Sequence, residues 1–416
     1  AIHNSSLYLN YTKVGSVVFK LIFKGGFMKF GYFCNTTNWT HKPFHQLLDE
    51  TKEITEYCDQ NKWDSIWFTE HHFNHEGMES CTNPLMMGAD AAARTKNIRI
   101  GQAANVITFH NPIRLAEDIA TLDQLSKGRV EVGVARGIYG REAINLNKEA
   151  DLKDQAKNFR LFAETLEVLK KAWTEKFFSH QGEFYTYPAP NHVWQHDMSP
   201  PSDEFMNLED NTMKKISVVP KPYQDPHPPI HQVVDGIRSI EWAAENNINV
   251  IMWIPTVKAL KVKFEAYKNK RSEVTKRNVP LGEGVTLVRD MFVADTMEEA
   301  KEKAGEHMVN YMRWVCHWRG LGNHMDPGEE LPETKGKLDL LNYEFLHQRN
   351  MLFGTPEYVI DKIHELKSEL NLQNLQVWSN FPGVKHKDCM KSIKLFTEKV
   401  MPHFKDDLSA EVKKVS

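Results

Sequence analysis

This sequence predicts an α/β protein in which eight parallel strands close into a (β/α)8 barrel, the TIM barrel. Short apolar runs rich in Val and Ile alternate along the chain with longer stretches whose apolar residues recur at helical spacing. Eight such runs follow one another, and this number suits a closed barrel. An open doubly wound sheet is the alternative, and the absence of a Gly-x-Gly-x-x-Gly motif after any predicted strand disfavours it.

The predicted strands share a short length and a run of apolar residues, as expected for strands buried on both faces. In chain order they span residues 28–33, 65–70, 98–105, 129–136, 230–234, 249–253, 285–294 and 375–379.

Helices are predicted between these strands, most clearly over residues 44–61, 112–128, 159–173 and 355–370. The second of them has Pro112 in its first turn and Gly128 at its end. The last opens with Thr355 as N-cap and Pro356 at the first helical position.

Two segments interrupt the alternation and are predicted to be long loop insertions. Residues 186–215 are polar and Pro-rich, and residues 312–345 mix aromatic residues with Gly, Pro and charge. Loops of this length within a compact domain are usually functional lids or disordered excursions. No linker divides the remainder, so residues 28–416 are expected to form one barrel domain. Residues 1–27 are expected to be a leader or extension outside the core, with Met28 as the natural start.

Composition narrows the range of partners. The chain is 41% hydrophobic and 26% charged with a net charge of −3, which gives no reason to expect nucleic acid or an anionic membrane as partner. No apolar run approaches the ~20 residues that a membrane-spanning helix needs. The five cysteines are scattered and lack a Cys-x-x-Cys pair, as expected of reduced thiols in a cytoplasmic protein.

Polar side chains follow several predicted strands at the point where each strand ends. Glu70, His71 and His72 come after the second strand in "WFTEHHF", and Arg136 follows the fourth. In a (β/α)8 barrel the carboxyl ends of all strands ring one mouth, where the active sites of this fold lie. We therefore expect these residues to converge.

Less specific interpretations of the same residues stay open. His71 and His75 are four residues apart and could bind a metal, but only on a helix, and the segment between 73 and 79 contains Gly77. No metal site is therefore predicted. His71 could also be a structural histidine, and Arg136 could pair with Glu131.

Several stretches resemble the bacterial luciferase-like family of flavin-dependent monooxygenases, and the catalytic luciferase subunit in particular. They include "DSIWFTEHHF", "HNPIRLAEDIATLDQLSKGRVEVGVARGIYG" and "FGTPEYVIDKI", and the resemblance extends from Met28 to about Ser379. It implies a barrel that binds reduced FMN, supplied by a separate NAD(P)H:flavin reductase, with O2 as co-substrate. The implied activity is that of a two-component monooxygenase, which acts through a C4a-(hydro)peroxyflavin on an apolar organic substrate. The resemblance also implies a homodimer packed through barrel helices in the first third of the chain.

The resemblance assigns roles around the flavin ring. His71 matches the catalytic histidine of the family, and Glu70 and His72 beside it are expected to orient it or to close the mouth. Ala103 and Ala104 match a site where the family carries a non-proline cis peptide under the ring. Asn105, which follows them, is included among the cofactor-binding residues.

A second group is assigned to the flavin phosphate. Arg136 matches an arginine that holds it, and the segment containing Gly236, Arg238 and Ser239 matches one that grips it with hydroxyl and backbone N–H groups. Arg238 departs from the family pattern, because many relatives carry a smaller or acidic residue there, and it could simply be a solvated residue. A further basic residue is expected from the helix near 157–160, and either Lys157 or Arg160 would serve.

Two other functions stay open on this fold. One is a deazaflavin-dependent oxidoreductase, and the other is a non-catalytic flavin-binding subunit. The substrate is open as well. Aromatic residues in the insertions suggest an apolar or aromatic compound such as an aldehyde, ketone, terpenoid or sulfur compound; they are Trp194, Phe205, Trp314 and Trp318. The spacing of Trp314 and Trp318 also fits two residues that pack one helix on the barrel.

Overall fold

The computed structural model describes residues 28–330 and 337–405, and in them eight parallel strands close into a barrel. The strands are β1 (Lys29–Cys34), β2 (Ser65–Phe68), β3 (Arg99–Gln102), β5 (Val130–Ala135), β8 (Ile230–Val233), β9 (Asn249–Met252), β10 (Val285–Val293) and β12 (Asn374–Trp378). Each pairs in parallel with the next, and β12 pairs with β1 to close the ring. The predicted fold and its eight strands are confirmed.

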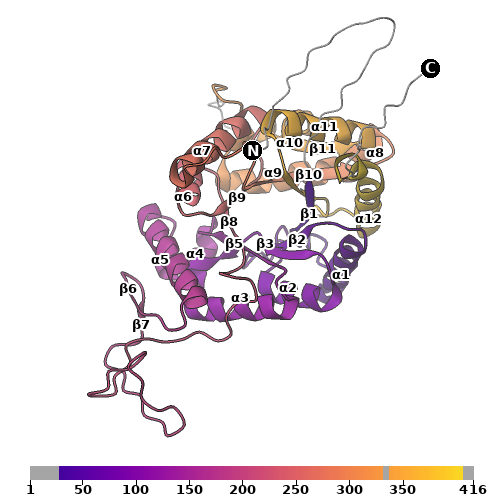
Figure 1. Cartoon of the computed structure of the whole chain (residues 1–416). Helices are drawn as coiled ribbons and strands as arrows, with labels where there is room; N and C mark the ends of the chain where they lie inside the picture. The colour runs from indigo at the N-terminus through magenta and orange to yellow at the C-terminus, as the bar shows by residue number, and fades with distance from the viewer. Residues whose placement is uncertain (1–27, 331–336, 406–416) are drawn as a thin grey trace, which may run out of the picture.

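Helices surround the strands in chain order, as Figure 1 shows. The outer ring consists of α1 (Phe44–Gln60), α2 (Pro84–Arg94), α3 (Pro112–Ser126), α5 (Gln155–Thr174), α6 (Ile237–Glu245), α7 (Val257–Thr275), α11 (Pro356–Leu370) and α12 (His386–Leu395). The predicted starts of α3 and α11 are confirmed, because Asn111 and Thr355 accept backbone N–H groups of their first turns, each with Pro as the next residue. The helix predicted from residue 159 begins four residues earlier, at Gln155.

Shorter strands and helices are added to this barrel of strands and surrounding helices. They are β4 (Asn105–Val106), α4 (Gly140–Leu146), β6 (His180–Gln181), β7 (Thr186–Tyr187), α8 (Met297–Ala300), α9 (Glu306–Arg319), α10 (Tyr343–Asn350), β11 (Met351–Gly354) and α13 (Pro402–Lys405). β4 adds to β5, β11 adds to β10, and β6 and β7 form an antiparallel pair.

The core has separate inner and outer parts. The larger part fills the space between strands and helices and includes Phe30, Ile66 and Val132. A smaller cluster inside the barrel joins Trp67, Ala103, Ile251 and Val288, with Phe33, Val233 and Trp253 packed against it. Successive side chains point to opposite faces of a strand, so the residues of each strand contribute alternately to the barrel interior and to the layer between strands and helices.

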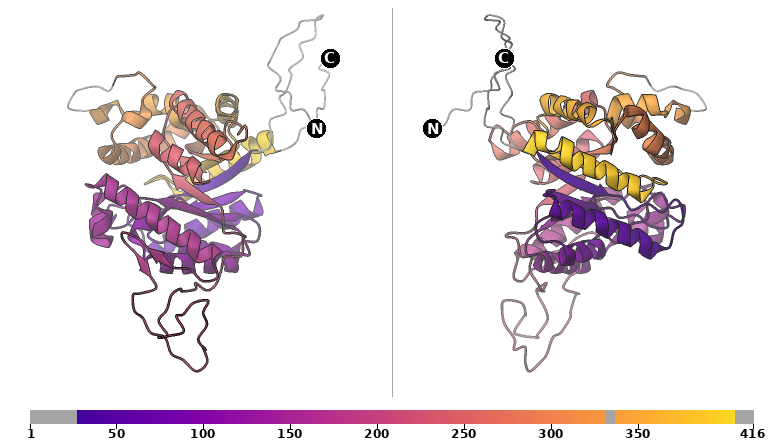
Figure 2. Two further views of the ribbon diagram at one scale, coloured as in Figure 1. Left: turned by 60° about the vertical axis from the view of Figure 1, so that its left-hand side comes forward. Right: turned by 90° about the vertical axis from the view of Figure 1, so that its right-hand side faces the viewer.

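The first predicted insertion is a projecting loop. Residues 186–215 extend away from the barrel wall in both views of Figure 2. Trp194 is 39% exposed there, and Phe205 stacks on Phe177. Trp194 and Phe205, two of the four aromatic residues that suggested an apolar substrate, therefore lie on this projecting segment.

The second predicted insertion is wrong as a continuous loop, since residues 312–319 belong to α9 and residues 343–345 to α10. Apolar residues at 308, 312 and 315 give α9 a buried face, and this face packs with Trp378 and Phe381. The spacing of Trp314 and Trp318 indicated such a helix, and both residues lie on α9. Residues 1–27, the predicted leader, lie outside the described residues. Within the described ranges, no helix is both long enough and apolar enough to cross a membrane.

Candidate active site

The carboxyl ends of the barrel strands meet beneath helix α9. Tyr311 of α9 contacts Asn35, which follows β1, and Glu79, which lies in the connection after β2. About two helical turns further on, α9 contacts the segments that follow three more strands. Trp318 packs on Tyr139, which follows β5. Arg319 contacts Asp235, which follows β8, and Trp253, which follows β9. α9 therefore crosses the mouth at which the predicted site residues were expected to converge.

His71 lies in this mouth between two buried carboxylates. Its Nδ1 atom is 3.5 Å from Oε2 of Glu79 and 3.6 Å from Oε1 of Glu142. The side chains of Glu79 and Glu142 are 4% and 1% exposed, whereas that of His71 is 15% exposed. The imidazole also packs against the ring of Tyr139, with 5.5 Å between centroids. Nδ1 thus faces the protein interior.

These carboxylates change the proton affinity of His71. Burial alone favours the neutral imidazole, but the negative charges of Glu79 and Glu142 outweigh it and raise the pKa of His71 above its ordinary value. Arg319, another neighbour, acts in the opposite direction. The imidazole is the side chain whose ordinary pKa lies closest to neutral pH, so it is suited to hold or move a proton during a reaction.

Buried hydrogen bonds fix Glu79. Its Oε1 atom accepts a hydrogen bond of 2.7 Å from the hydroxyl of Tyr311, and that hydroxyl accepts one of 3.0 Å from Asn35. Thr69 in turn donates to Oδ1 of Asn35. The chain of contacts ties β1, β2 and α9 to the carboxylate at His71, and it leaves Oε2 of Glu79 facing Nδ1.

Glu70 faces the other way. Its carboxylate contacts Nε2 of His72 at 3.0 Å and Nε2 of His110 at 2.8 Å, and it accepts the backbone N–H of Val106 at 2.7 Å. Burial favours the neutral acid, but the hydrogen bonds from His110 and His72 outweigh it and lower the pKa of Glu70. Glu70 was expected to orient His71; the structure instead brings Glu70 to His72 and His110, and brings Glu79 and Glu142 to His71.

His72 also supports this arrangement through its backbone. Its N–H donates a hydrogen bond of 2.6 Å to Oε1 of Glu142, the same oxygen that lies 3.6 Å from Nδ1 of His71. The two adjacent histidines thus share Glu142, one through its ring and one through its backbone.

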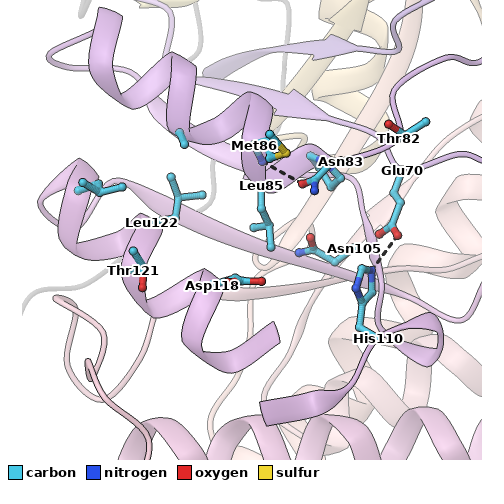
Figure 3. Close-up of a pocket in the computed structure, with 13 residues that line it drawn as sticks. Glu70, Thr82, Asn83, Leu85, Met86, Asn105, His110, Asp118, Thr121 and Leu122 are labelled. Atoms are coloured by element: carbon cyan, nitrogen blue, oxygen red, sulfur yellow. Dashed lines mark hydrogen bonds and ion pairs between the residues drawn. The ribbon is translucent and has the colours of Figure 1, made fainter. Parts of the chain in front are cut away.

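Glu70 and His110 border a cavity of about 370 Å³ on the outside of the barrel. Figure 3 shows the cavity between α2 and α3, with His110 reaching across to Glu70. Leu85 and Leu122 line it, while Met86 and Leu125 at its rim are 70% and 62% exposed. This cavity is therefore distinct from the mouth around His71.

Arg136 and Arg238 lie together at another part of the strand ends. Both guanidinium groups lie 5.7 Å from the centroid of the Phe159 ring. Burial, together with the positive charge of Arg238, lowers the pKa of Arg136. Neither arginine has a carboxylate partner among residues 28–330 and 337–405. Two neighbouring cations without a counter-ion form a site suited to a phosphate dianion.

Lys157 and Arg160 were the alternatives for a further basic residue at the phosphate, and each is paired with a carboxylate instead. Their ion-pair partners are Glu149 and Glu183, and the α5 residues that accept hydrogen bonds from the Arg136 side chain are Gln155 and Asn158.

Gly236 is the N-cap of α6, and Ser239 lies in its first turn. A Cβ atom added at Gly236 would meet nothing within 4 Å. The start of α6 therefore offers backbone N–H groups beside Arg238, in the arrangement that binds anions at helix N-termini.

The Ala103–Ala104 peptide bond is cis, as the resemblance implied. Asn105 braces the backbone beside it, since its Nδ2 group donates to Oε1 of Gln102 and to the carbonyl of Gly133. A Cβ atom at Gly133 would lie 1.6 Å from the carbonyl oxygen of Gln102, so only Gly permits this close approach of the two strands.

Two open alternatives from the sequence can be compared with the structure. Glu131 pairs with Arg99 and His231, so it is not the partner of Arg136. His75 is 85% exposed and adjoins Glu76 rather than His71.

The sequence did not indicate four residues of this mouth: Glu79, Glu142, Tyr311 and Arg319. Glu142 lies in α4, six residues after Arg136, in the connection that follows the fourth barrel strand. This proximity to a predicted site residue was the one signal in the sequence that could have identified it. Asp290, also not predicted, accepts a hydrogen bond of 3.1 Å from the Trp253 indole. Burial raises the pKa of Asp290 to about 7.

Known proteins resemble this chain in sequence and in fold. Residues 28–371 match the family model of luciferase-like monooxygenases. The chain is 25% identical to the oxygenase component of the flavin-dependent trigonelline monooxygenase of Acinetobacter baylyi, over 87% of this chain and 91% of that protein. It is 27% identical to an alkanal monooxygenase alpha chain of Photorhabdus luminescens, over 91% of this chain and 98% of that protein.

Solved structures share the fold. The oxygenating constituent of 3,6-diketocamphane monooxygenase of Pseudomonas putida, in complex with FMN, superposes with a TM-score of 0.71 at 21% identity, covering 90% of this chain and 98% of that chain. A secondary alcohol dehydrogenase that depends on coenzyme F420 superposes with a TM-score of 0.65 at 16% identity, covering 92% of this chain and 100% of that chain.

Proposed function

Because the chain belongs to the luciferase-like monooxygenase family, we propose that it is the oxygenase component of a two-component system that uses reduced FMN and O2 to oxygenate an apolar organic substrate. The family and the names of its relatives support a flavin-dependent monooxygenase.

The pairing of Arg136 with Arg238 carries the assignment to FMN. Two guanidinium groups face one aromatic ring with no carboxylate partner among the described residues, beside the open start of α6. A flavin mononucleotide carries a phosphate of close to two negative charges, which these groups match. The residues present therefore fit this cofactor, with the phosphate held by Arg136, Arg238 and the first turn of α6.

The isoalloxazine ring would lie between the phosphate site and His71, against Ala103 and Ala104. The apolar cluster inside the barrel supports this location, because Ala103 belongs to it together with Trp67 and Ile251. When bound, reduced flavin would supply two electrons to O2, so that one oxygen atom of O2 is transferred to the substrate and the other leaves as water.

His71 performs the proton chemistry in this proposal. Glu79 and Glu142 both face Nδ1, so they hold the proton on that atom and direct Nε2 away from them, toward the mouth. Nε2 then accepts or donates the proton that the reaction requires. Tyr311 and Asn35 keep Glu79 in position and so keep the ring oriented.

The residues of α9 restrict water at the same place. Tyr311 packs at 4.8 Å on Trp378 and at 6.0 Å on Trp253, and Trp318 packs at 5.8 Å on Tyr139. Aromatic walls around a reacting centre protect reactive species from hydrolysis and strengthen the electrostatic effect of nearby charges.

We propose in addition that two copies pack through α2 and α3, in the first third of the chain. Met86 and Leu125 expose large apolar side chains at the rim of the cavity between these helices, as expected of a surface that a second copy covers. The reducing partner is a separate NAD(P)H:flavin reductase, since the first relative named above is itself an oxygenase component.

Hydride transfer with coenzyme F420 is the second candidate, because a protein with this cofactor shares the fold. A decisive comparison measures binding of reduced FMN and of reduced coenzyme F420 under anaerobic conditions, followed by mixing with O2 and candidate substrates. Tight binding of reduced FMN and O2-dependent product formation support the proposal. Preferential binding of coenzyme F420 with O2-independent turnover contradicts it.

The alternative that the protein is a non-catalytic flavin-binding subunit is tested with the variant His71→Ala. If the protein is an enzyme, this variant retains FMN binding and loses turnover. Turnover at the parent rate would remove His71 from the mechanism.

A further inference from the structure

Arg319 is a cationic side chain of the mouth in addition to Arg136 and Arg238, and the proposed flavin site gives it no role. It is the last residue of α9, and its side chain is 16% exposed. The carboxylates of Asp235 and Glu79 act on its charge, and Arg319 in turn acts on His71. The guanidinium therefore lies among the groups that surround the proposed acid–base residue.

Most hydrogen-bond donors of Arg319 are unused. A guanidinium carries five N–H groups. In the described part of the chain only Nη1 has a partner, Oδ2 of Asp235 at 3.2 Å, and Asp235 is itself 45% exposed. Nε is buried without a hydrogen-bond partner there, and Nη2 makes no hydrogen bond there either. The Nε–Nη2 edge, which binds a carboxylate through two parallel hydrogen bonds, is thus available.

The surroundings of this edge are aromatic. The guanidinium lies 6.0 Å from the ring centroid of Trp253, which packs on the inner cluster that contains Ala103. Trp318, the neighbour of Arg319 in α9, packs on Tyr139, which packs on His71. A flat apolar group could therefore lie against these rings with a polar end directed at Arg319.

We propose that Arg319 binds a carboxylate of the organic substrate, so that the substrate is an apolar, ring-containing acid rather than a neutral hydrocarbon or aldehyde. This inference rests on the proposed function and specifies the substrate class of the same site. Asp235 holds the guanidinium through Nη1, and the substrate carboxylate occupies Nε and Nη2. The apolar part of the substrate then extends toward His71.

Benzoate and benzamide are the probes that test this inference, because they share a flat ring and differ in charge. Titration calorimetry on the FMN-loaded protein should show benzoate binding at least ~10-fold more tightly than benzamide, the effect of a charge-assisted pair of hydrogen bonds. Arg319→Gln should abolish this preference, and Arg319→Lys should retain part of it, since the charge remains without the planar fork. Arg313→Gln, on the same helix, is the matched control and should keep the full preference.

Three results would overturn the inference. One is equal binding of the two probes, or binding of neither, to the parent protein; Arg319 then only fastens α9 to Asp235. Another is an unchanged preference in Arg319→Gln. The third is a ~10-fold loss of FMN affinity in Arg319→Gln, which would assign the guanidinium to the cofactor. Because FMN binding is measured separately, failure of the parent protein to bind FMN would instead contradict the proposed function.

Discussion

Oε2 of Glu79 lies 3.5 Å from Nδ1 of His71, while the other oxygen of the same carboxylate accepts the hydroxyl of Tyr311. This relationship joins an imidazole at the end of β2 to a helix inserted more than two hundred residues later. In the proposed mechanism it makes α9 part of the acid–base machinery as well as a cover of the barrel mouth, and it gives the raised pKa of His71 a specific cause.

The first prediction concerns that cause. Glu79→Gln removes a negative charge that favours the imidazolium form of His71, so the pKa of His71 should fall. Titration of the His71 ring by NMR in the FMN-free protein measures the change. Glu76→Gln is the matched control, because Glu76 pairs with Arg141 on the surface. The same midpoint in Glu79→Gln as in the parent would contradict the role of Glu79.

The second prediction concerns the phosphate. Arg136→Gln should weaken FMN binding ~10- to 100-fold, the usual effect of losing a hydrogen bond to a charged group, and should leave riboflavin binding nearly unchanged. Flavin fluorescence titration measures both ligands. Arg160→Gln serves as control, since Arg160 is engaged with Glu183, and it should bind FMN like the parent. An equal loss for FMN and riboflavin would place Arg136 elsewhere on the cofactor.

The third prediction concerns Asp290. Its pKa is about 7 in the folded protein against 3.8 ordinarily, so the folded state retains a proton that the unfolded chain has released. Stability should therefore fall as pH rises from about 4 to about 7. Asp290→Asn lacks this ionisation and should be more stable than the parent at pH 8, by up to roughly 4 kcal/mol, with little difference near pH 4.

Urea unfolding of Asp290→Asn and the parent protein at the two pH values measures this difference. The amide oxygen of Asn can still accept the Trp253 indole N–H, so the hydrogen bond is preserved in the variant. An equal difference in stability at both pH values would show that Asp290 is ionised in the folded protein throughout this range.

The fourth prediction concerns assembly. Leu125→Glu places a charge on the exposed apolar rim between α2 and α3, so it should convert the proposed dimer into a monomer. Sedimentation velocity measures the state. Val262→Glu on α7 is the control, because Val262 is 51% exposed and lies away from these helices. Dissociation by both variants, or by neither, would remove α2 and α3 as the interface.

The sequence predicted the barrel because its strands and helices have local signals. Apolar runs such as 65–70 and caps such as Thr355 depend on neighbouring residues alone. The predicted convergence of His71 with Arg136 and Arg238 followed from one general property of parallel strands, that their carboxyl ends lie on one side.

The partners of His71 could not be predicted in this way. Glu79 lies in an irregular connection, and Tyr311 and Arg319 lie on a helix whose placement over the mouth depends on tertiary packing. Glu70 shows that a residue next to His71 in the sequence need not contact it in the structure. It adjoins His71 in sequence, but neighbouring residues at a strand end point in different directions, and its carboxylate meets His110 on the outer side.

The most direct measurement of the central claim is a crystal structure of the protein with FMN. The account predicts that the phosphate contacts Arg136 and Arg238 at the start of α6, and that the ring lies against Ala103 and Ala104 within reach of His71. An FMN bound with its phosphate away from both arginines, or with its ring outside the barrel mouth, would contradict it.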